Sequence, residues 1–187
     1  MTKTELYKEL GNVNHSSEKR LFYANMVIDN PKLIHPLLEI LFEVDDKVSC
    51  RAAWVFEFMC SNTLEAIIPY LDTFTENMSK VHLDPAVRPV AKICELLTKV
   101  YYGKEASKIK QALTPVHKEH MIEACFDWMI NDEKIAPKAY SMNSLYLLGT
   151  EYDWIHPELA IILERDFQMQ SSGFKARARH ILKKIKR

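Results

Sequence analysis

The chain has 187 residues, of which 48% are hydrophobic, and this suits one domain whose core needs no disulfide or metal. Lysine plus arginine and aspartate plus glutamate both number 25, so the molecule lacks the net charge that attracts nucleic acid or anionic membranes nonspecifically. The N-terminus is charged where a signal peptide is apolar, and no run approaches the ~20 apolar residues of a membrane span, which predicts a cytoplasmic protein without membrane association.

Only four glycines interrupt a chain dominated by helix-forming residues, and apolar residues recur at helical spacing, so we predict an all-α fold. Most helix starts are marked by Pro, Ser, Thr, Asp or Asn. In chain order the predicted helices span residues 4–10, 17–29, 31–42, 47–60, 63–79, 85–102, 115–130, 134–148, 157–170 and 173–186. Short connections predict antiparallel hairpins. The exception is the charged stretch 103–114, expected to be either a short extra helix or a mobile loop.

One pattern occurs four times: an acidic or hydroxyl residue is followed after three residues by an apolar residue, after seven by alanine and after ten by a second apolar residue. The first residue is predicted to cap a helix, and the other three to form a buried stripe in which alanine lets neighbouring helices approach closely. The copies begin 39, 48 and 39 residues apart, and the stretch 103–114 explains the longer interval. They are Asp45-Val48-Ala52-Val55, Asp84-Val87-Ala91-Cys94, Asp132-Ile135-Ala139-Met142 and Ser171-Phe174-Ala178-Ile181.

The second copy resembles the signature that opens the second helix of a HEAT repeat, since it reads Asp84-Pro85-Ala86-Val87-Arg88-Pro89-Val90-Ala91. The resemblance to this armadillo-type family implies a single domain, a right-handed α-α superhelix of about four helical hairpins, whose second helices line a concave face. It implies repeats at 31–61, 62–102, 115–149 and 157–187, an N-terminal capping helical pair at 1–30 and an insertion at 103–114.

A HEAT-like fold implies no single activity, so the exposed positions must indicate the function. On the predicted second helices, side chains facing away from the apolar stripe are polar or aromatic and of mixed charge, which favours a protein or peptide partner over bare nucleic acid. We therefore predict a noncatalytic scaffold that binds such a partner on its concave face, without cofactor, metal or catalytic residue; an ordinary solvated face has a similar pattern. The candidate binding residues are Arg88, Lys92, Lys138, Tyr140, Asn143, Lys175 and Arg179.

The last predicted helix is the most charge-biased segment, because residues 173–187 contain seven bases and no acid. Within it, Lys175, Arg179 and Lys183 form one cationic stripe opposite the apolar line. This stripe suits the phosphates of a nucleic acid or an acidic protein; alternatively, its cations only complement the dipole of their own helix. An exposed end of the predicted solenoid would also suit a homodimer.

DNA binding is the second functional hypothesis, because HEAT-like alkylpurine DNA glycosylases engage a damaged nucleotide with aromatic and acidic residues. Asp127-Trp128 and Asp153-Trp154 are similar pairs. The chain is short for that family, however, and Trp128 falls within an apolar stripe that indicates core packing. A further resemblance, to lyases of the adenylosuccinate lyase type, rests on the segment 171–175 alone. It lacks the Met-Pro and Asn positions of their serine-rich loop and so does not support a lyase.

Two groups of residues are candidates for a metal or redox site. His117, His120 and Glu123 follow one another at three-residue spacing, which in principle suits a divalent metal, but surface histidines on a helix need no ligand. The cysteines are widely separated and form no Cys-x-x-Cys motif, which predicts buried free thiols. They are Cys50, Cys60, Cys94 and Cys125.

Overall fold

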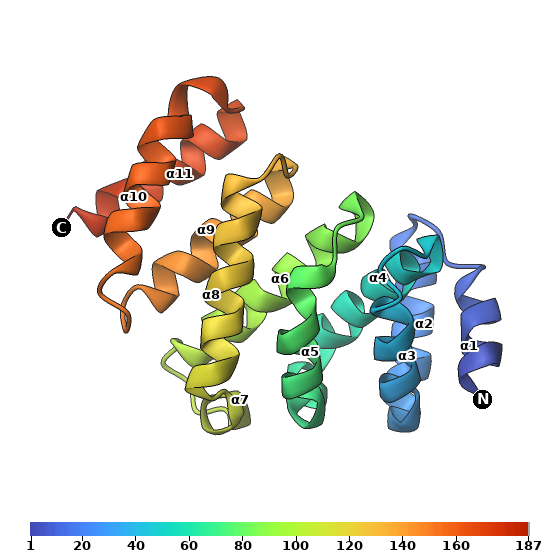
Figure 1. Cartoon of the computed structure of the whole chain (residues 1–187). Helices are drawn as coiled ribbons and strands as arrows, with labels where there is room; N and C mark the ends of the chain where they lie inside the picture. Colours follow the sequence, from blue (N-terminus) through green and yellow to red (C-terminus); the bar gives the residue numbers. More distant parts are fainter. Residues whose placement is uncertain (187) are drawn as a thin grey trace.

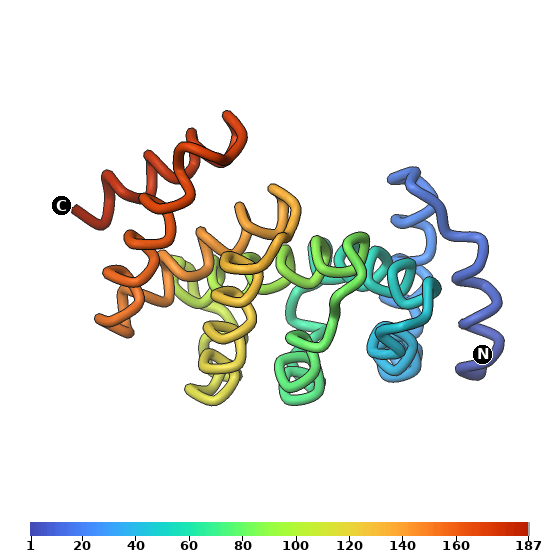
Figure 2. Tube along the Cα trace, turned by 45° about the horizontal axis from the view of Figure 1, so that its top comes forward, coloured from blue at the N-terminus to red at the C-terminus, as the bar shows by residue number. Residues whose placement is uncertain are grey.

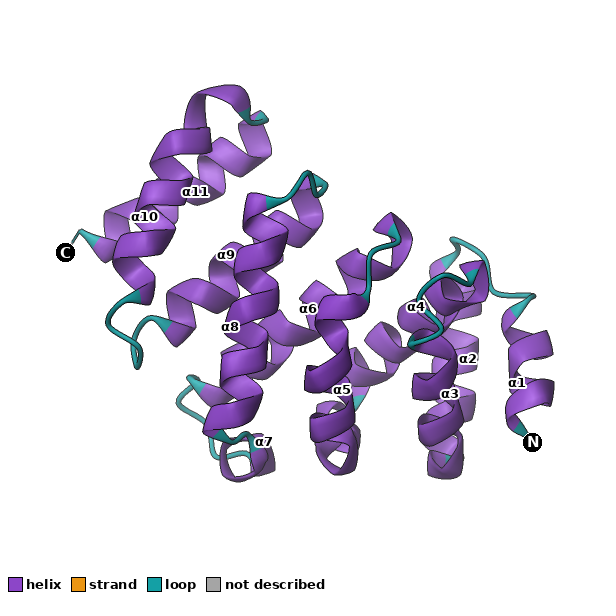
Figure 3. Ribbon diagram, viewed as in Figure 1, coloured by secondary structure: helices purple, strands orange, loops and turns teal. Residues whose placement is uncertain are grey.

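The computed structural model describes residues 1–186 as an all-helical protein, with 79% helix and no strand in this part of the chain (Figure 3). No helix within these residues is long and apolar enough to cross a membrane. Arg187, the last base of the predicted basic segment, lies outside the described residues. The α-helices are α1 Lys3–Leu10, α2 Ser17–Asp29, α3 Ile34–Leu41, α4 Lys47–Asn62, α5 Leu71–Asn77, α6 Asp84–Tyr101, α7 Lys108–Ala112, α8 Pro115–Ile130, α9 Ile135–Leu148, α10 Ile155–Asp166 and α11 Ser172–Ile185.

The helices form two layers that run from one end of the molecule to the other (Figure 1). In what we call the inner layer, α2 packs against α4, α4 against α6, α6 against α9, and α9 against α11. The outer layer consists of α3, α5, α8 and α10, in which α5 contacts α8. The stack bends into a shallow arc with the inner layer on its inner side, and the termini lie at opposite ends (Figure 1, Figure 2).

The core lies between these layers as one cluster of buried apolar residues that extends from α1 to α11. At the N-terminal end, α1 packs against α3 and α4. Its apolar residues Leu6 and Leu10 are fully buried. Helix α1 therefore covers one end of the stack.

One of the ten predicted segments is divided in the structure, and the structure decides between the two alternatives for the stretch 103–114. The segment 63–79, predicted as one helix, is a 3-10 helix Leu64–Tyr70, then α5, then a 3-10 turn Met78–Lys80. Pro69 lies inside the first of these and has no N–H to donate, which interrupts an α-helix at that point. The stretch 103–114 contains the short helix α7, which packs against α6 with Ile109 fully buried.

The predicted helix caps are confirmed at the end of the chain and shifted near its beginning. The Ser171 hydroxyl accepts a hydrogen bond from the N–H of Phe174 at 3.3 Å, as the pattern predicts. In the first copy the prediction of Asp45 is wrong by one residue. Helix α4 begins at Lys47, as predicted, so the residue directly before it is Asp46, whose carboxylate accepts the N–H of Val48 at 2.8 Å.

The two middle copies have no side-chain cap, so the predictions of Asp84 and Asp132 as caps are wrong. Asp84 is the first residue of α6 itself, and its carboxylate pairs instead with Lys134 Nζ at 3.0 Å. The residue before α9 is Lys134, two positions after Asp132, and its side chain has no oxygen that could accept a hydrogen bond. The first turns of α6 and α9 are consequently left without a side-chain acceptor.

The alanine of the repeated pattern is fully buried in three copies, at Ala52, Ala91 and Ala178. The third copy is different, since Ala139 is half-buried and Ile135 is 47% exposed. There the close approach of α9 to α6 uses serine instead. Ser144 is fully buried and its hydroxyl lies 3.5 Å from the hydroxyl of Thr98. The side of α9 that faces α6 is therefore rotated from the predicted stripe, so that Ser144 rather than Ala139 lies at the contact.

Replacing Ala91 with leucine is expected to destabilise the protein by about 1–3 kcal/mol, because the added atoms must enter a filled contact between inner-layer helices. Urea unfolding followed by circular dichroism measures the change. Ala176, an exposed alanine of α11, is the matched control, and Ala176→Leu should change stability little. An unchanged unfolding midpoint for Ala91→Leu would contradict this close approach.

Candidate functional site

Polar side chains from five inner-layer helices lie along one face of that layer and are connected by ion pairs, hydrogen bonds and cation–ring contacts. In α6, residues 88, 92 and 95 share this face because they are four and three positions apart, whereas 87, 91 and 94 face the core. We call the set the polar ladder. Its members are Arg20 of α2, Trp54 and Glu57 of α4, Arg88, Lys92 and Glu95 of α6, Tyr140 and Asn143 of α9, and Arg177 of α11.

Glu57 and Arg88 join α4 to α6 by a bidentate ion pair. Arg88 donates Nη1 to Oε1 at 2.9 Å and Nη2 to Oε2 at 2.6 Å. The Glu57 side chain is 9% exposed, against 31% for Arg88, so the acid is the partner that burial would penalise if the pair were broken. The arginine of the HEAT-like signature therefore neutralises a buried carboxylate of the preceding inner helix.

Glu95 gathers donors from three helices and is the centre of the ladder. Its side chain is 2% exposed. Its oxygens lie 2.7 Å from Lys92 Nζ, 2.6 Å from Asn143 Nδ2, 3.0 Å from Lys99 Nζ and 3.7 Å from Arg177 Nη1. Burial alone would raise the pKa of Glu95, but the hydrogen bonds from Lys92, Asn143 and Lys99 together outweigh it and hold that pKa below its ordinary value. One buried negative charge thus faces three cations.

Four of the seven candidate residues predicted from the sequence lie together in the ladder. Arg88 and Lys92 are bound as described, Asn143 donates to Glu95, and Tyr140 presents its ring 4.8 Å from Lys92 Nζ. Each of the four sits on an inner helix opposite its core-facing stripe, which is the placement that the helical spacing predicts.

The other three candidates lie elsewhere. Lys138 is 6% exposed, and its ammonium donates to the carbonyl of Met129 at the α8–α9 corner. Arg179 lies over the ring of Phe167, 5.6 Å from its centre. Lys175 is four residues before Arg179 on the same side of α11. These three residues are not brought next to the ladder.

Arg177 and Lys184, on a different side of α11, do reach the inner face, and the sequence reasoning missed them. Together with His180 they line a hollow of about 510 Å³ beside Asn143. The pattern favoured the cations opposite the apolar line, but a terminal helix that packs against α9 turns one flank toward the inner layer. Residues 173, 177, 180 and 184 recur at helical spacing on that flank, which is the signal that could have found them.

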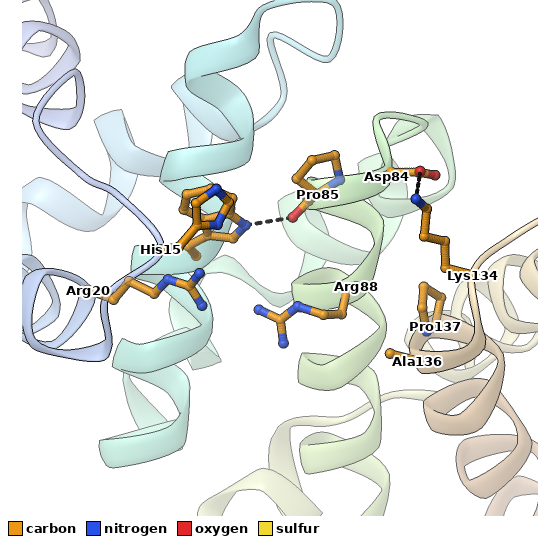
Figure 4. Close-up of a pocket in the computed structure, with 9 residues that line it drawn as sticks. His15, Arg20, Asp84, Pro85, Arg88, Lys134, Ala136 and Pro137 are labelled. Carbon is orange, nitrogen blue, oxygen red and sulfur yellow. Dashed lines mark hydrogen bonds and ion pairs between the residues drawn. The ribbon is translucent and has the colours of Figure 1, made fainter. Parts of the chain in front are cut away.

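At the other end of the ladder, residues of α2, α4, α6 and α9, with one residue each from the loops before α2 and α9, line a cleft of about 290 Å³, which we call the inner cleft (Figure 4). The guanidinium groups of Arg20 and Arg88 extend into it from opposite sides. Burial, and then the positive charge of Arg88, lower the pKa of Arg20, and the nearby negative charge of Glu57 offsets them only in part. The lining residues are His15, Arg20, Trp54, Asp84, Pro85, Arg88, Lys134, Ala136 and Pro137.

Arg20 is held in place without an acidic partner within residues 1–186. Its guanidinium stacks 4.6 Å from the ring of Trp54 and 5.8 Å from that of Phe58, and its Nε donates to the carbonyl of Asn14 at 3.4 Å. Trp54 is fixed in turn, because its Nε1 donates to the carbonyl of Pro85 at 2.7 Å. A fixed cation with unused N–H donors therefore faces the cleft.

A second polar cluster lies where α8 meets the turn after α9. Lys118 is only 2% exposed, and its ammonium donates to Glu151 at 2.6 Å and to the Tyr101 hydroxyl at 3.0 Å. Tyr102 also donates to Glu151, at 2.7 Å. The sequence reasoning did not single out this cluster, because a lysine on an outer helix is usually solvated. All members are bonded to one another, which indicates a structural role.

The histidines weighed as metal ligands are hydrogen-bonded to α5 instead. Nδ1 of His117 accepts the N–H of Thr114 at 3.1 Å, so Nε2 carries the proton and donates to Asp72 at 2.6 Å. His120 Nδ1 lies 3.4 Å from the Thr75 hydroxyl. Across residues 1–186, no cluster of three or more His, Cys, Asp or Glu side chains is arranged to hold a metal ion.

The four cysteines are free and buried, as predicted. Burial raises the pKa of the Cys60 and Cys94 thiols well above the ordinary value, so neither is activated as a nucleophile.

The acid–tryptophan pairs of the DNA hypothesis belong to outer-layer elements rather than to the polar ladder. Trp128 is 3% exposed in the core, whereas Asp127 faces solvent. Trp154 is 53% exposed just before α10 and stacks on Phe126 of α8, with ring centres 5.6 Å apart. The serine of the lyase-like segment, Ser171, is occupied as the cap of α11.

Comparison with known proteins adds no relative, since no protein-family model, curated protein or solved structure matches the chain.

Proposed function

We propose that the protein is a noncatalytic HEAT-like scaffold, a right-handed superhelix of helical hairpins that binds an acidic peptide or protein segment along its inner layer. The polar ladder carries the proposal. It offers more cations than acids, together with the partly exposed ring of Tyr140, across five inner helices. The four free cysteines suit a reducing compartment such as the cytoplasm.

An extended acidic peptide fits this surface better than a nucleic acid does. Both ladder carboxylates, Glu57 and Glu95, are already neutralised by bound cations, so the excess positive charge is small and broken into separate points. A nucleic acid repeats a phosphate at every nucleotide and needs many cations in succession. A peptide with spaced acidic side chains matches the distribution of charge along the ladder.

The test compares two sides of one helix. Arg177→Gln/Lys184→Gln removes two charges beside Asn143, whereas Arg179→Gln/Lys183→Gln removes the same charges from the side of α11 away from the ladder. Binding of a fluorescein-labelled peptide rich in spaced Glu and Leu residues is measured by anisotropy. We expect the first variant to weaken binding about tenfold, from two lost ion pairs of about 0.5–1 kcal/mol each, and the control to change it little.

Equal loss of affinity in both variants, or no binding of the acidic peptide by the wild type, would refute the proposed surface. A labelled duplex DNA serves as the alternative ligand. The DNA hypothesis predicts binding that falls steeply with salt, and the glycosylase form of it also predicts release of alkylated bases that is lost in Asp153→Asn or Trp154→Ala. Light scattering of the same preparations determines whether the protein is a homodimer.

A further inference from the structure

The inner cleft holds two like charges and too little negative charge to balance them. Arg88 uses both Nη atoms on Glu57, which neutralises one positive charge. Arg20 faces the same space and has no acidic partner within the described chain. Guanidinium groups do not lose their proton at physiological pH, so this repulsion cannot be relieved by titration. An anion placed between the two groups would relieve it.

The cation that lacks a partner is also pre-organised for an anion. Stacking on Trp54 and Phe58 fixes the guanidinium plane through ring faces, which consume none of its N–H donors. Only Nε is used, in the bond to Asn14. Because Arg20 is already held in one orientation, little side-chain entropy is lost when its terminal N–H groups bind a ligand.

Two helix N-termini add to the positive potential at the same place. The first turns of α6 and α9 supply Pro85, Ala136 and Pro137 to the lining, and neither helix has a side-chain cap. The positive ends of both helix dipoles therefore lie at the cleft; the first turn of α6 already contains Asp84, so the end of α9 is the one that favours a further negative group. Asp84 and Lys134 at the rim pair with each other, so together they leave the net charge of the cleft unchanged.

The donors left free at the cleft indicate which anion fits: the terminal N–H groups of Arg20 and, from the opposite side, the N–H groups of Arg88 that its bidentate pair with Glu57 leaves over. A carboxylate has two oxygens in one plane and one negative charge, and a single guanidinium fork can satisfy it. A phosphate monoester has three terminal oxygens and a charge of about −1.5 to −2 at neutral pH, so it can accept from both sides of the cleft at once. The apolar walls formed by Trp54, Pro85 and Pro137 leave room for a carbon group attached to the phosphate.

We infer that the inner cleft binds a phosphate monoester, carried by a phosphorylated side chain of the peptide partner. That a peptide carries the phosphate rests on the proposed function, whereas phosphate binding itself depends only on the residues of the inner cleft. Inorganic phosphate would occupy the same groups without the contact to the apolar walls.

Phosphate binding by the inner cleft is tested first with small ligands, by titration calorimetry of the full chain with phenyl phosphate, inorganic phosphate and benzoate. Phenyl phosphate is expected to bind at least tenfold more tightly than benzoate, and Arg20→Gln to weaken it at least tenfold. Arg20→Lys keeps the positive charge but not the paired N–H donors of the guanidinium, so its affinity for phenyl phosphate should lie between those of the wild type and Arg20→Gln. Arg165→Gln removes a distant arginine bound to Asp166 and should leave the affinity unchanged. Equal affinities for wild type and Arg20→Gln, or for phenyl phosphate and benzoate, would overturn the inference.

Thermal unfolding separates this role from a structural one. If Arg20 only supported Trp54, its removal would lower the melting temperature. Because it also faces Arg88, we expect Arg20→Gln to leave that temperature unchanged or slightly higher without ligand, and to abolish the rise caused by phenyl phosphate.

The carrier is tested with three versions of one acidic peptide, containing phosphotyrosine, glutamate or tyrosine at its centre. Preference for the phosphorylated version that disappears in Arg20→Gln supports the inference. If all three bind alike and remain sensitive to Arg177→Gln/Lys184→Gln, the inference fails while the proposed function stands. If phenyl phosphate binds but no peptide does, the carrier is wrong and the proposed function fails with it. Tighter binding of 5′-phosphorylated single-stranded DNA than of the phosphopeptide would likewise overturn the peptide carrier.

Discussion

Replacing Glu151 with alanine is expected to destabilise the protein by about 3 kcal/mol, because it leaves the ammonium of Lys118 buried without its negative partner. The Lys118 side chain is 3% exposed, whereas that of Glu151 is 40% exposed. After the substitution, only the Tyr101 hydroxyl and the nearby tyrosine rings remain to stabilise the charge. Urea unfolding at neutral pH measures the loss.

The reverse change provides the control, because the two partners differ in exposure. Lys118→Met removes the buried charge and leaves Glu151 at the surface, hydrated and still bound by Tyr102, so we expect a loss of about 1 kcal/mol or less. If Lys118→Met proved as harmful as Glu151→Ala, the penalty would not come from an unpaired buried cation.

The same pair predicts a dependence on pH. Burial acts to raise the pKa of Glu151, but hydrogen bonds from Lys118 and Tyr102 outweigh it and lower that pKa from 4.5. A lowered pKa in the folded state means that the unfolded state binds the proton more readily. The stabilisation is therefore complete above the ordinary glutamate value and is lost as pH falls below it. Unfolding midpoints of wild type and Glu151→Ala should accordingly converge in acid.

Replacing Arg88 with alanine is expected to destabilise the protein by about 3 kcal/mol, the lower end for a broken buried pair because the arginine is 31% exposed. The cost arises from Glu57, whose carboxylate stays buried between α4 and α6 with both oxygens unbonded. Chemical denaturation monitored by circular dichroism gives the change. Because Arg88→Ala is destabilised, binding of peptide or phosphate by this variant is measured only under conditions where circular dichroism shows it to be folded.

A double substitution distinguishes the buried charge from lost packing. Glu57→Met/Arg88→Met removes both charges and keeps most of the volume, so we expect it to recover at least half of the stability lost in Arg88→Ala. If the double variant were as unstable as the single one, the unpaired carboxylate would not explain the result.

The local helical structure could be predicted from sequence because its signals are local. Apolar periodicity located all ten predicted segments, and the last position of each repeated pattern, from Val55 to Ile181, is buried as expected. The errors arose where a single residue competed with the pattern. Pro69 interrupted one helix, and of two adjacent aspartates it is Asp46, not Asp45, that directly precedes α4 and caps it.

The candidate site could be predicted only in part, because helical periodicity gives the face of a residue but not its neighbour. It placed Arg88, Lys92, Tyr140 and Asn143 together. It could not show that Arg88 is bound to Glu57, since these two residues are 31 positions apart in the chain and belong to different helices.

The sequence by itself determined that this protein is helical, where most helices begin, and which side of each helix is apolar, because these follow from spacing along one chain. Only the tertiary structure decided which flank of α11 faces the inner layer, which cations are already neutralised, and that Arg20 and Arg88 share one cleft. Those outcomes depend on the angles and offsets between packed helices, which are set by contacts among residues far apart in the chain.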